Sequence, residues 1–148
     1  LLISLIIYNI FFIKKIVYVD NLKVFNEFKM TKELIKTGDK VLLKQKRELD
    51  SLYSILNTSV NETTKKITVE KIIEQKQIIE DFQKNYSSIN SNRIWNRIND
   101  YLKEFSKENS YDLVIGFQTS DGLFYGKEEL DVTNEAVKYV NNKYEGLK

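Results

Sequence analysis

The sequence predicts an α+β protein: a small β-barrel-forming body, with three short strands per subunit, and a long antiparallel helical-hairpin arm of coiled-coil type. The 148 residues include no proline and only five glycines, which favours long uninterrupted helices. Apolar residues recur seven apart through the middle of the chain, and strand-like stretches occur only near its two ends. We therefore assign residues 14–30 and 93–148 to an oligomerisation body, residues 31–92 to the arm, and residues 1–13 to a separate segment.

The first thirteen residues, LLISLIIYNIFFI, are continuously apolar and are followed by Lys14 and Lys15. They are too few for a membrane span of about 20 residues and match the apolar region of a signal peptide. Because the chain does not begin with Met, a signal peptide clipped at its start is one interpretation, and an uncleaved membrane anchor is another. The missing small-residue cleavage site favours the anchor, whereas the lysine pair is typical of a cytoplasmic flank. A buried core helix is the third interpretation, and we favour export.

Short β-branched and aromatic runs predict the strands of the body. IVYVD at 16–20 is the first, and Asn21 is the expected cap of the helix that follows. Residues 112–117 include the apolar run LVIGF, which predicts a strand covered on both faces. SDG at 120–122 is a turn signal, and residues 123–126 form the predicted returning strand.

A short helix closes the predicted body, with Asp131 or Thr133 at its start and Val137 and Val140 on its inner face. One such helix cannot cover three apolar strands, and a three-stranded sheet has two open edges. Pairing with other copies removes both problems, because a closed barrel has no edges. A trimer would supply nine strands, although the sequence alone leaves the number open. The predicted oligomer interface is Ile16, Val17, Val19, Leu113, Val114, Ile115, Phe117, Leu123 and Tyr125.

The first helix of the arm is predicted from apolar residues at heptad spacing. Ile35, Leu42, Leu49 and Leu56 lie seven apart, a stripe typical of a helix that packs along a partner helix, and Gly38 is its weak point. Asn, Thr and Ser concentrate in residues 57–66 and predict the turn between two antiparallel helices.

The second helix is predicted from about Val69 to Phe105, with Thr64 or Thr68 as its cap. Ile72, Ile79 and Tyr86 again lie seven apart, and the apolar stripe thickens from Ile89 onwards. A plain three- or four-helix bundle is the alternative, but the chain lacks the further helices that a bundle needs.

The composition argues against several classes of function. Cysteine and histidine are absent, which excludes disulfides, thiolate nucleophiles and histidine-based metal sites, triads or bases. The formal net charge of +2 supplies no concentrated basic surface for nucleic acid. Glu48 with Asp50, and Glu128 with Glu129 and Asp131, are interpreted as solvent-exposed charges rather than catalytic pairs. We predict no enzyme activity, no metal and no cofactor.

The body resembles the Skp/OmpH family of periplasmic chaperones. The resemblance lies in IVYVDNLKVFNEF, YDLVIGF and LFYGKEELDVTNEAVKYVNNKY, including Tyr125, Asp131 and Thr133, and in their order around a long helical hairpin. The resemblance covers residue 16 to the end of the chain, but the hairpin matches the family only as a type of structure and not in its motifs.

The resemblance implies a homotrimer whose β-barrel body carries three arms that enclose a cavity. It further implies a periplasmic location, reached through a signal peptide or kept by inner-membrane attachment through residues 1–13, and binding of unfolded outer-membrane proteins without ATP. The family's archetype has strongly basic arms. This chain differs, because residues 31–92 contain 11 Lys/Arg and 9 Asp/Glu.

Two hypotheses of function follow. The first is a holdase chaperone that binds unfolded outer-membrane proteins and prevents their aggregation. Its expected client-binding residues are the apolar arm residues outside the seam: Leu43, Tyr53, Ile55, Ile73 and Ile78. The alternative is a membrane-anchored coiled-coil tether that binds one specific folded partner.

Overall fold

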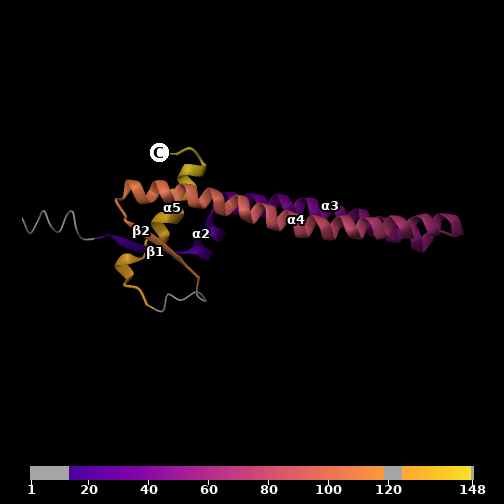
Figure 1. The fold of residues 1–148 in the computed structure, drawn as a ribbon. Helices are drawn as coiled ribbons and strands as arrows, with labels where there is room; N and C mark the ends of the chain where they lie inside the picture. The colour runs from indigo at the N-terminus through magenta and orange to yellow at the C-terminus, as the bar shows by residue number, and fades with distance from the viewer. Residues whose placement is uncertain (1–13, 119–124, 148) are drawn as a thin grey trace, which may run out of the picture. The chain divides into compact units, whose positions relative to one another are not determined.

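The computed structural model describes residues 14–118 and 125–147 (Figure 1). In chain order the elements are β1 (Ile16–Asp20), α2 (Asn21–Glu27), α3 (Lys29–Thr58), α4 (Glu62–Glu108), β2 (Leu113–Phe117), the 3₁₀ turn η1 (Glu128–Leu130) and α5 (Thr133–Tyr144). The described chain divides into two compact units. The sheet unit comprises the described residues up to Thr31 and from Ile94 onwards, and the hairpin unit comprises Lys32–Arg93. The predicted α+β class with long helices is confirmed.

The sheet unit contains a two-stranded parallel sheet. β1 and β2 pair in register from Ile16 opposite Leu113 to Asp20 opposite Phe117. The other edge of β1 is occupied at one point, where Tyr18 forms a bridge with Asp131 and its carbonyl accepts a hydrogen bond from the Val132 amide at 3.0 Å. β1 is therefore central, and no described residue pairs with the outer edge of β2.

The third strand predicted at residues 123–126 is not found among the described residues. Residues 123 and 124 lie outside the described part, and Tyr125 and Gly126 belong to no strand. This stretch contacts Tyr18 instead. Gly126 lies so close to the Tyr18 ring that a Cβ on it would collide with the ring. The Tyr18 hydroxyl donates a hydrogen bond to the Lys127 carbonyl at 3.3 Å. The ring of Tyr18 therefore fixes this segment, where the sequence predicted strand pairing.

One face of the sheet is buried and the other is open. Val17 and Val19 point into the core, whereas Leu113 and Ile115 on β2 are 48% and 42% exposed. Within the single chain, the strand at 113–117 is therefore covered on one face only, and its predicted cover on both faces by other copies stays a prediction. The remaining core side chains of the sheet unit come from the helices and the segment before α5: Val24, Phe28, Met30, Ile94, Ile98, Phe105, Val132, Ala136, Val137 and Val140.

Side-chain hydrogen bonds fix the ends of β1 and α5. Asp20, not Asn21 as predicted, caps α2, because its Oδ1 accepts from the Lys23 amide at 3.0 Å. Thr133 is the first residue of α5, and its hydroxyl oxygen accepts from the Asp20 amide at 2.9 Å. Asp131 Oδ1 accepts from the Thr133 amide at 2.9 Å and also from the Thr133 hydroxyl. The Asp-x-Thr sequence thus ties the start of α5 to the end of β1, while Val132 holds the cap position without a side-chain bond.

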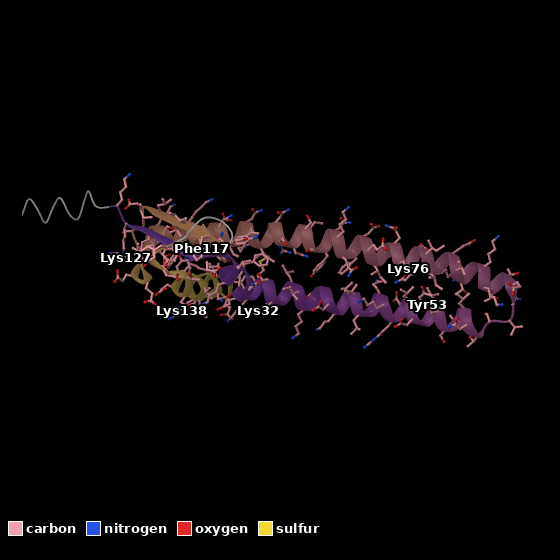
Figure 2. All side chains as sticks on the ribbon, turned by 90° about the horizontal axis from the view of Figure 1, so that it is seen from below. Lys32, Tyr53, Lys76, Phe117, Lys127 and Lys138 are labelled. Atoms are coloured by element: carbon pink, nitrogen blue, oxygen red, sulfur yellow. The ribbon has the colours of Figure 1, made fainter. Side chains whose placement is uncertain are left out.

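The hairpin unit is built on a seam of buried and half-buried side chains between α3 and α4 (Figure 2). Successive seam residues on each helix are spaced mainly three or four residues apart in alternation, as in coiled coils. The seam residues are Leu34, Gly38, Leu42, Gln45, Leu49, Leu52 and Leu56 on α3, and Thr68, Ile72, Gln75, Ile79, Phe82, Tyr86 and Asn90 on α4.

Two predicted members of this stripe lie outside it. Ile35 and Ile89 are 57% and 65% exposed. Consecutive steps of four residues occur near one end of the seam on both helices, from Leu34 to Leu42 and from Tyr86 to Ile94. Positions spaced strictly seven apart move gradually around the surface of a straight helix. Consecutive steps of four residues correct this movement, so Leu34 and Asn90 occupy the seam in place of their neighbours Ile35 and Ile89.

The connection between the helices is shorter than predicted. α3 continues to Thr58 and α4 begins at Glu62. Asn61 Oδ1 accepts from the amides of Thr63 and Thr64 at 2.9 and 3.2 Å, so Asn61 caps α4. Thr68, a predicted cap, is buried in the seam. Among the described residues, no helix is both long enough and apolar enough to span a membrane.

Candidate functional site

The first candidate surface is the open face and outer edge of β2 in the sheet unit. The register places Ile16 beside Leu113 and Tyr18 beside Ile115 on the same face. Tyr18 and Phe117 meet edge to face, with ring centroids 5.5 Å apart. This face is apolar and lies next to a strand edge that pairs with none of the described residues, an arrangement that favours addition of another strand.

The predicted interface residues differ widely in exposure. Ile16, Leu113 and Ile115 are exposed on the open face, and Val114 and Phe117 are half-buried. Val17 and Val19 are only 3% and 1% exposed, so their side chains belong to the core of the subunit rather than to a surface. Tyr125 is 80% exposed, and Leu123 lies outside the described residues.

A cleft of about 710 Å³ adjoins the core-facing side of β2. Val114 and Gly116 line it from the strand, and Trp95 and Leu102 line it from the part of α4 that belongs to the sheet unit. The side chain of Asn21 occupies the space beside Gly116, where a Cβ would collide with it. The sequence interpretation did not predict this cleft, whose lining also includes Val19 and Asn21 from the other end of the chain.

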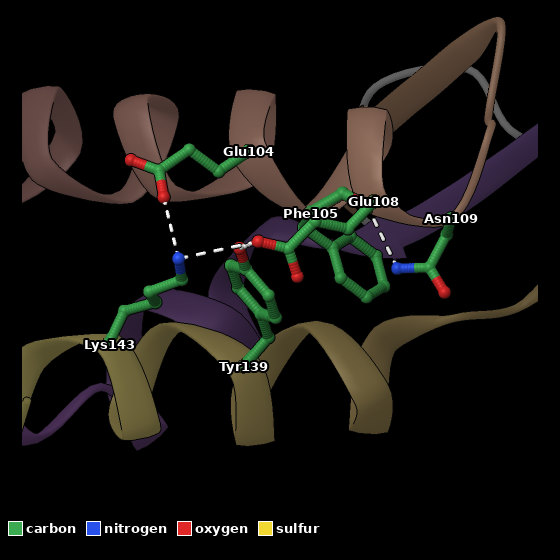
Figure 3. A network of polar contacts seen from close by, with 6 residues as sticks. All are labelled: Glu104, Phe105, Glu108, Asn109, Tyr139 and Lys143. Carbon is green, nitrogen blue, oxygen red and sulfur yellow. Dashed lines mark hydrogen bonds and ion pairs between the residues drawn. The ribbon is translucent and has the colours of Figure 1, made fainter. Parts of the chain in front are cut away.

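A polar network fastens α5 to α4 within the sheet unit (Figure 3). Lys143 Nζ lies 2.8 Å from Glu104 Oε2 and 3.3 Å from Glu108 Oε1, and the Tyr139 hydroxyl donates to Glu108 Oε1 at 2.7 Å. The hydrogen bond from Tyr139 and the nearby Lys143 ammonium lower the pKa of Glu108. The hydrogen bond to Glu104 is the main cause of the raised pKa of Lys143. The groups are solvent-exposed, so their role is to position α5 and their contribution to stability is small.

The second candidate surface is the exposed apolar part of the hairpin unit. The five predicted client-binding residues are all exposed, and Ile73 is the most exposed of them at 64%. The ring of Tyr53 lies across from α4, with Lys76 Nζ 5.7 Å from its centroid (Figure 2). The sequence interpretation missed further exposed apolar residues that also lie outside the seam: Ile35, Val41, Val60, Ile67, Val69 and Ile89. Helical position relative to the seam was the signal that could have found all of these except Val60, which lies in the connection between the helices.

Two glutamines, Gln45 and Gln75, form a polar pair within the apolar seam of the hairpin unit. Gln75 Nε2 donates to Gln45 Oε1 at 2.5 Å and to the Gln45 carbonyl at 3.2 Å. A polar pair in an apolar seam fixes the register of the two helices, because a shift would leave both amides without partners.

Gly38 provides the space for an aromatic side chain in the seam. The Tyr86 ring lies against the backbone of α3, and a Cβ at Gly38 would be 2.6 Å from its Cε1 atom. The Tyr86 hydroxyl donates to the Leu34 carbonyl at 2.8 Å, and the ring stacks on Phe82 with centroids 4.8 Å apart. The glycine that looked like a weak point is therefore a packing site.

Replacing Gly38 by alanine is expected to lower the free energy of unfolding by about 1–3 kcal/mol, because the new methyl group overpacks the seam. In a Tyr86→Ala background the same change is expected to raise it by up to about 1 kcal/mol, since alanine favours helix over glycine. Urea unfolding of the four variants measures both effects. Thr37→Ala, at the neighbouring exposed position, is the control for helix propensity and should be stabilising in either background. The same sign for Gly38→Ala in both backgrounds would contradict the packing role of Tyr86.

These features define a class of protein: a small parallel sheet covered by short helices, together with a long antiparallel hairpin of coiled-coil type. The chain belongs to the OmpH family, described as Outer membrane protein (OmpH-like), which matches residues 15–140. The predicted family is thereby confirmed. It is a family of periplasmic chaperones rather than enzymes. A search of curated proteins finds no match to the chain.

Proposed function

We propose that this protein is an ATP-independent holdase that binds unfolded outer-membrane proteins in the periplasm and prevents their aggregation. The observation that carries the proposal is the set of exposed apolar side chains on the hairpin unit, outside the seam that holds its helices together. Membership of a chaperone family supports the same function. Residues 1–13, the proposed signal peptide or inner-membrane attachment, lie outside the described part of the chain.

The working form that we propose is a homotrimer. The outer edge of β2 has no partner among the described residues, and the open face beside it carries Ile16, Leu113 and Ile115. Strands from other copies would satisfy the backbone groups of this edge and cover the apolar face. The cleft lined by Trp95 and Leu102 leaves room for a side chain or turn of the neighbouring copy.

Such a holdase acts by mass action. A protein that binds the unfolded form of a client lowers the concentration available for aggregation, with no need for an energy source. Each exposed apolar contact is weak, but several hairpin units in one oligomer present many contacts at high effective concentration. Weak individual contacts also allow the client to leave in steps.

The test is light scattering during dilution of a urea-unfolded β-barrel membrane protein, with and without the chaperone. A variant with glutamine at Leu43, Tyr53, Ile55, Ile73 and Ile78 should need about tenfold more protein for the same suppression, equivalent to losing about 1.4 kcal/mol of binding free energy. Because all five positions are exposed, the fold should be retained. The control carries glutamine at Leu22, Leu130 and Leu147, which are exposed apolar residues of the sheet unit.

Equal aggregation with and without the wild-type protein would refute the holdase proposal. Equal suppression by the hairpin variant and the control would show that clients bind elsewhere. Isolation of one folded partner at a fixed ratio, in place of a range of unfolded chains, would support the tether.

A further inference from the structure

Two segments of the hairpin unit, one on each helix, carry opposite charge. Between residues 32 and 47, α3 contains six Lys or Arg and only two acidic residues, a net charge of +4. Between residues 70 and 81, α4 contains four acidic residues and two lysines, a net charge of −2. The near-neutral total for the hairpin therefore conceals a local separation of charge between these two segments.

The basic residues of α3 form the rim of a shallow groove on the surface of that helix. Lys32, Lys36 and Lys40 lie four residues apart and exposed, on the side of α3 away from the seam. They surround the exposed apolar residues Ile35 and Leu43 in a groove of about 420 Å³ that also includes Asp39. The groove thus has an apolar floor and a mainly cationic rim.

The outward face of α4 has the complementary arrangement. Ile73 projects from it, and Glu70, Glu74 and Gln77 lie within one turn of Ile73. Asp81 continues the acidic row by one further turn, and all five residues are exposed. This face therefore presents an apolar side chain beside the carboxylates of Glu70 and Glu74, and Lys66 and Lys84 lie at the two ends of the acidic row.

The two faces cannot meet within one hairpin, because both are directed away from the seam that joins α3 to α4. We propose that, in the absence of client, the acidic face of α4 in one copy docks into the groove on α3 of a second copy, with Ile73 against Ile35 and Leu43. This contact is heterologous, and the symmetry of a closed ring of copies would repeat it at every interface.

The docking regulates client binding, and in this respect it rests on the proposed holdase function. Leu43 and Ile73 are two of the proposed client-binding residues, so docked hairpins cover them and a client must displace the neighbouring copy. Single surface ion pairs contribute little, which makes the contact weak between free chains. Inside one oligomer, where tethering gives effective concentrations of about 1 mM, it can form and still be displaced.

Site-directed cross-linking tests the proposal in the full chain, which has no cysteine of its own. Copies with Lys36→Cys and copies with Glu74→Cys are unfolded together, refolded and mildly oxidised. We expect the 36–74 disulfide to exceed the 36–36 and 74–74 products about tenfold, as effective concentration at the docked contact predicts. The yield should fall in about 0.5 M salt, where screening shortens the range of the charges. In the matched control, Ser88→Cys replaces Glu74→Cys on the exposed side of α4 beyond the acidic row, and we expect little product.

Charge reversal provides a second measurement. Lys32→Glu with Lys40→Glu, added to the Lys36→Cys copy, should reduce the 36–74 yield several-fold. Glu70→Lys with Asp81→Lys, added to the Glu74→Cys copy, should then restore it. Equal yields of all three disulfides, or reversal without effect, would overturn the proposal.

The holdase assay on the same samples separates the two proposals. An excess of unfolded client should lower the 36–74 yield, and a yield unchanged by saturating client would overturn the regulatory role. Suppressed aggregation without the 36–74 disulfide refutes the docking alone. The disulfide without suppression refutes the holdase and leaves the contact between copies in place. Cross-linking of Lys36→Cys to client in preference to a second copy would identify the groove as a client site and overturn the docking.

Discussion

Replacing Leu113 and Ile115 by aspartate is expected to convert the proposed oligomer into folded monomers. Both side chains are exposed on the open face of β2, at 48% and 42%, beside the strand edge that has no partner among the described residues. Assembly of the variant would bury unpaired carboxylates, each at a cost of several kcal/mol. Sedimentation equilibrium over a dilution series measures the mass, and circular dichroism should show that the helices remain. Aggregation suppression should fall with the mass, since avidity is lost.

Ile89→Glu is the matched control for this prediction. Ile89 is a more exposed apolar residue, at 65%, but it lies in the hairpin unit. Its replacement by an acidic residue should leave the mass unchanged. If the wild-type chain is a folded monomer at every concentration, or if the double variant keeps its oligomeric mass, β2 is not the assembly edge.

Phe28→Ala is expected to produce the largest loss of stability, about 3–5 kcal/mol. Phe28 is fully buried, and its ring meets the edges of Tyr101 on α4 and Tyr144 on α5, with centroids 6.3 and 5.3 Å apart. Removing the ring leaves a cavity where α2, α4 and α5 meet. Urea unfolding at one fixed protein concentration measures the effect, because assembly also contributes to stability.

Phe28→Leu is the control for the cavity, since it keeps most of the apolar volume and should cost about 1.5 kcal/mol or less. A loss below about 1 kcal/mol for Phe28→Ala would mean that the site collapses around the missing ring. That result would contradict the role of Phe28 in holding the three helices together.

The sequence predicted the helical hairpin well because its signal is local. Leu42, Leu49, Leu56, Ile72 and Ile79 reveal the seam by spacing alone, and the structure places each of them in it. The exposed apolar residues proposed to bind clients were found by the same reasoning, as the positions that the seam leaves over. The failures at Ile35 and Ile89 came from assuming a strict repeat of seven where both helices step by four.

The sheet was predicted less well because pairing depends on residues far apart in the chain. The first two strands were located from their β-branched runs, but their parallel partnership joins residues 16–20 to residues 113–117. Val17 and Val19 had the same apolar character as Leu113 and Ile115, yet only the former pair is buried. No local pattern states which face of a strand the helices will cover.

The sequence by itself determined the family, the long helices and the two ends that form the sheet unit, since these depend on composition, period and motif order. Only the tertiary structure decided that Asp131 and Val132 take one edge of β1, that Tyr18 packs on Gly126, and that the outer edge of β2 has no described partner. The contacts of Tyr18 with Gly126, Asp131 and Val132 join residues roughly a hundred positions apart. Such contacts follow from the shape of the folded core and not from any repeat along the chain.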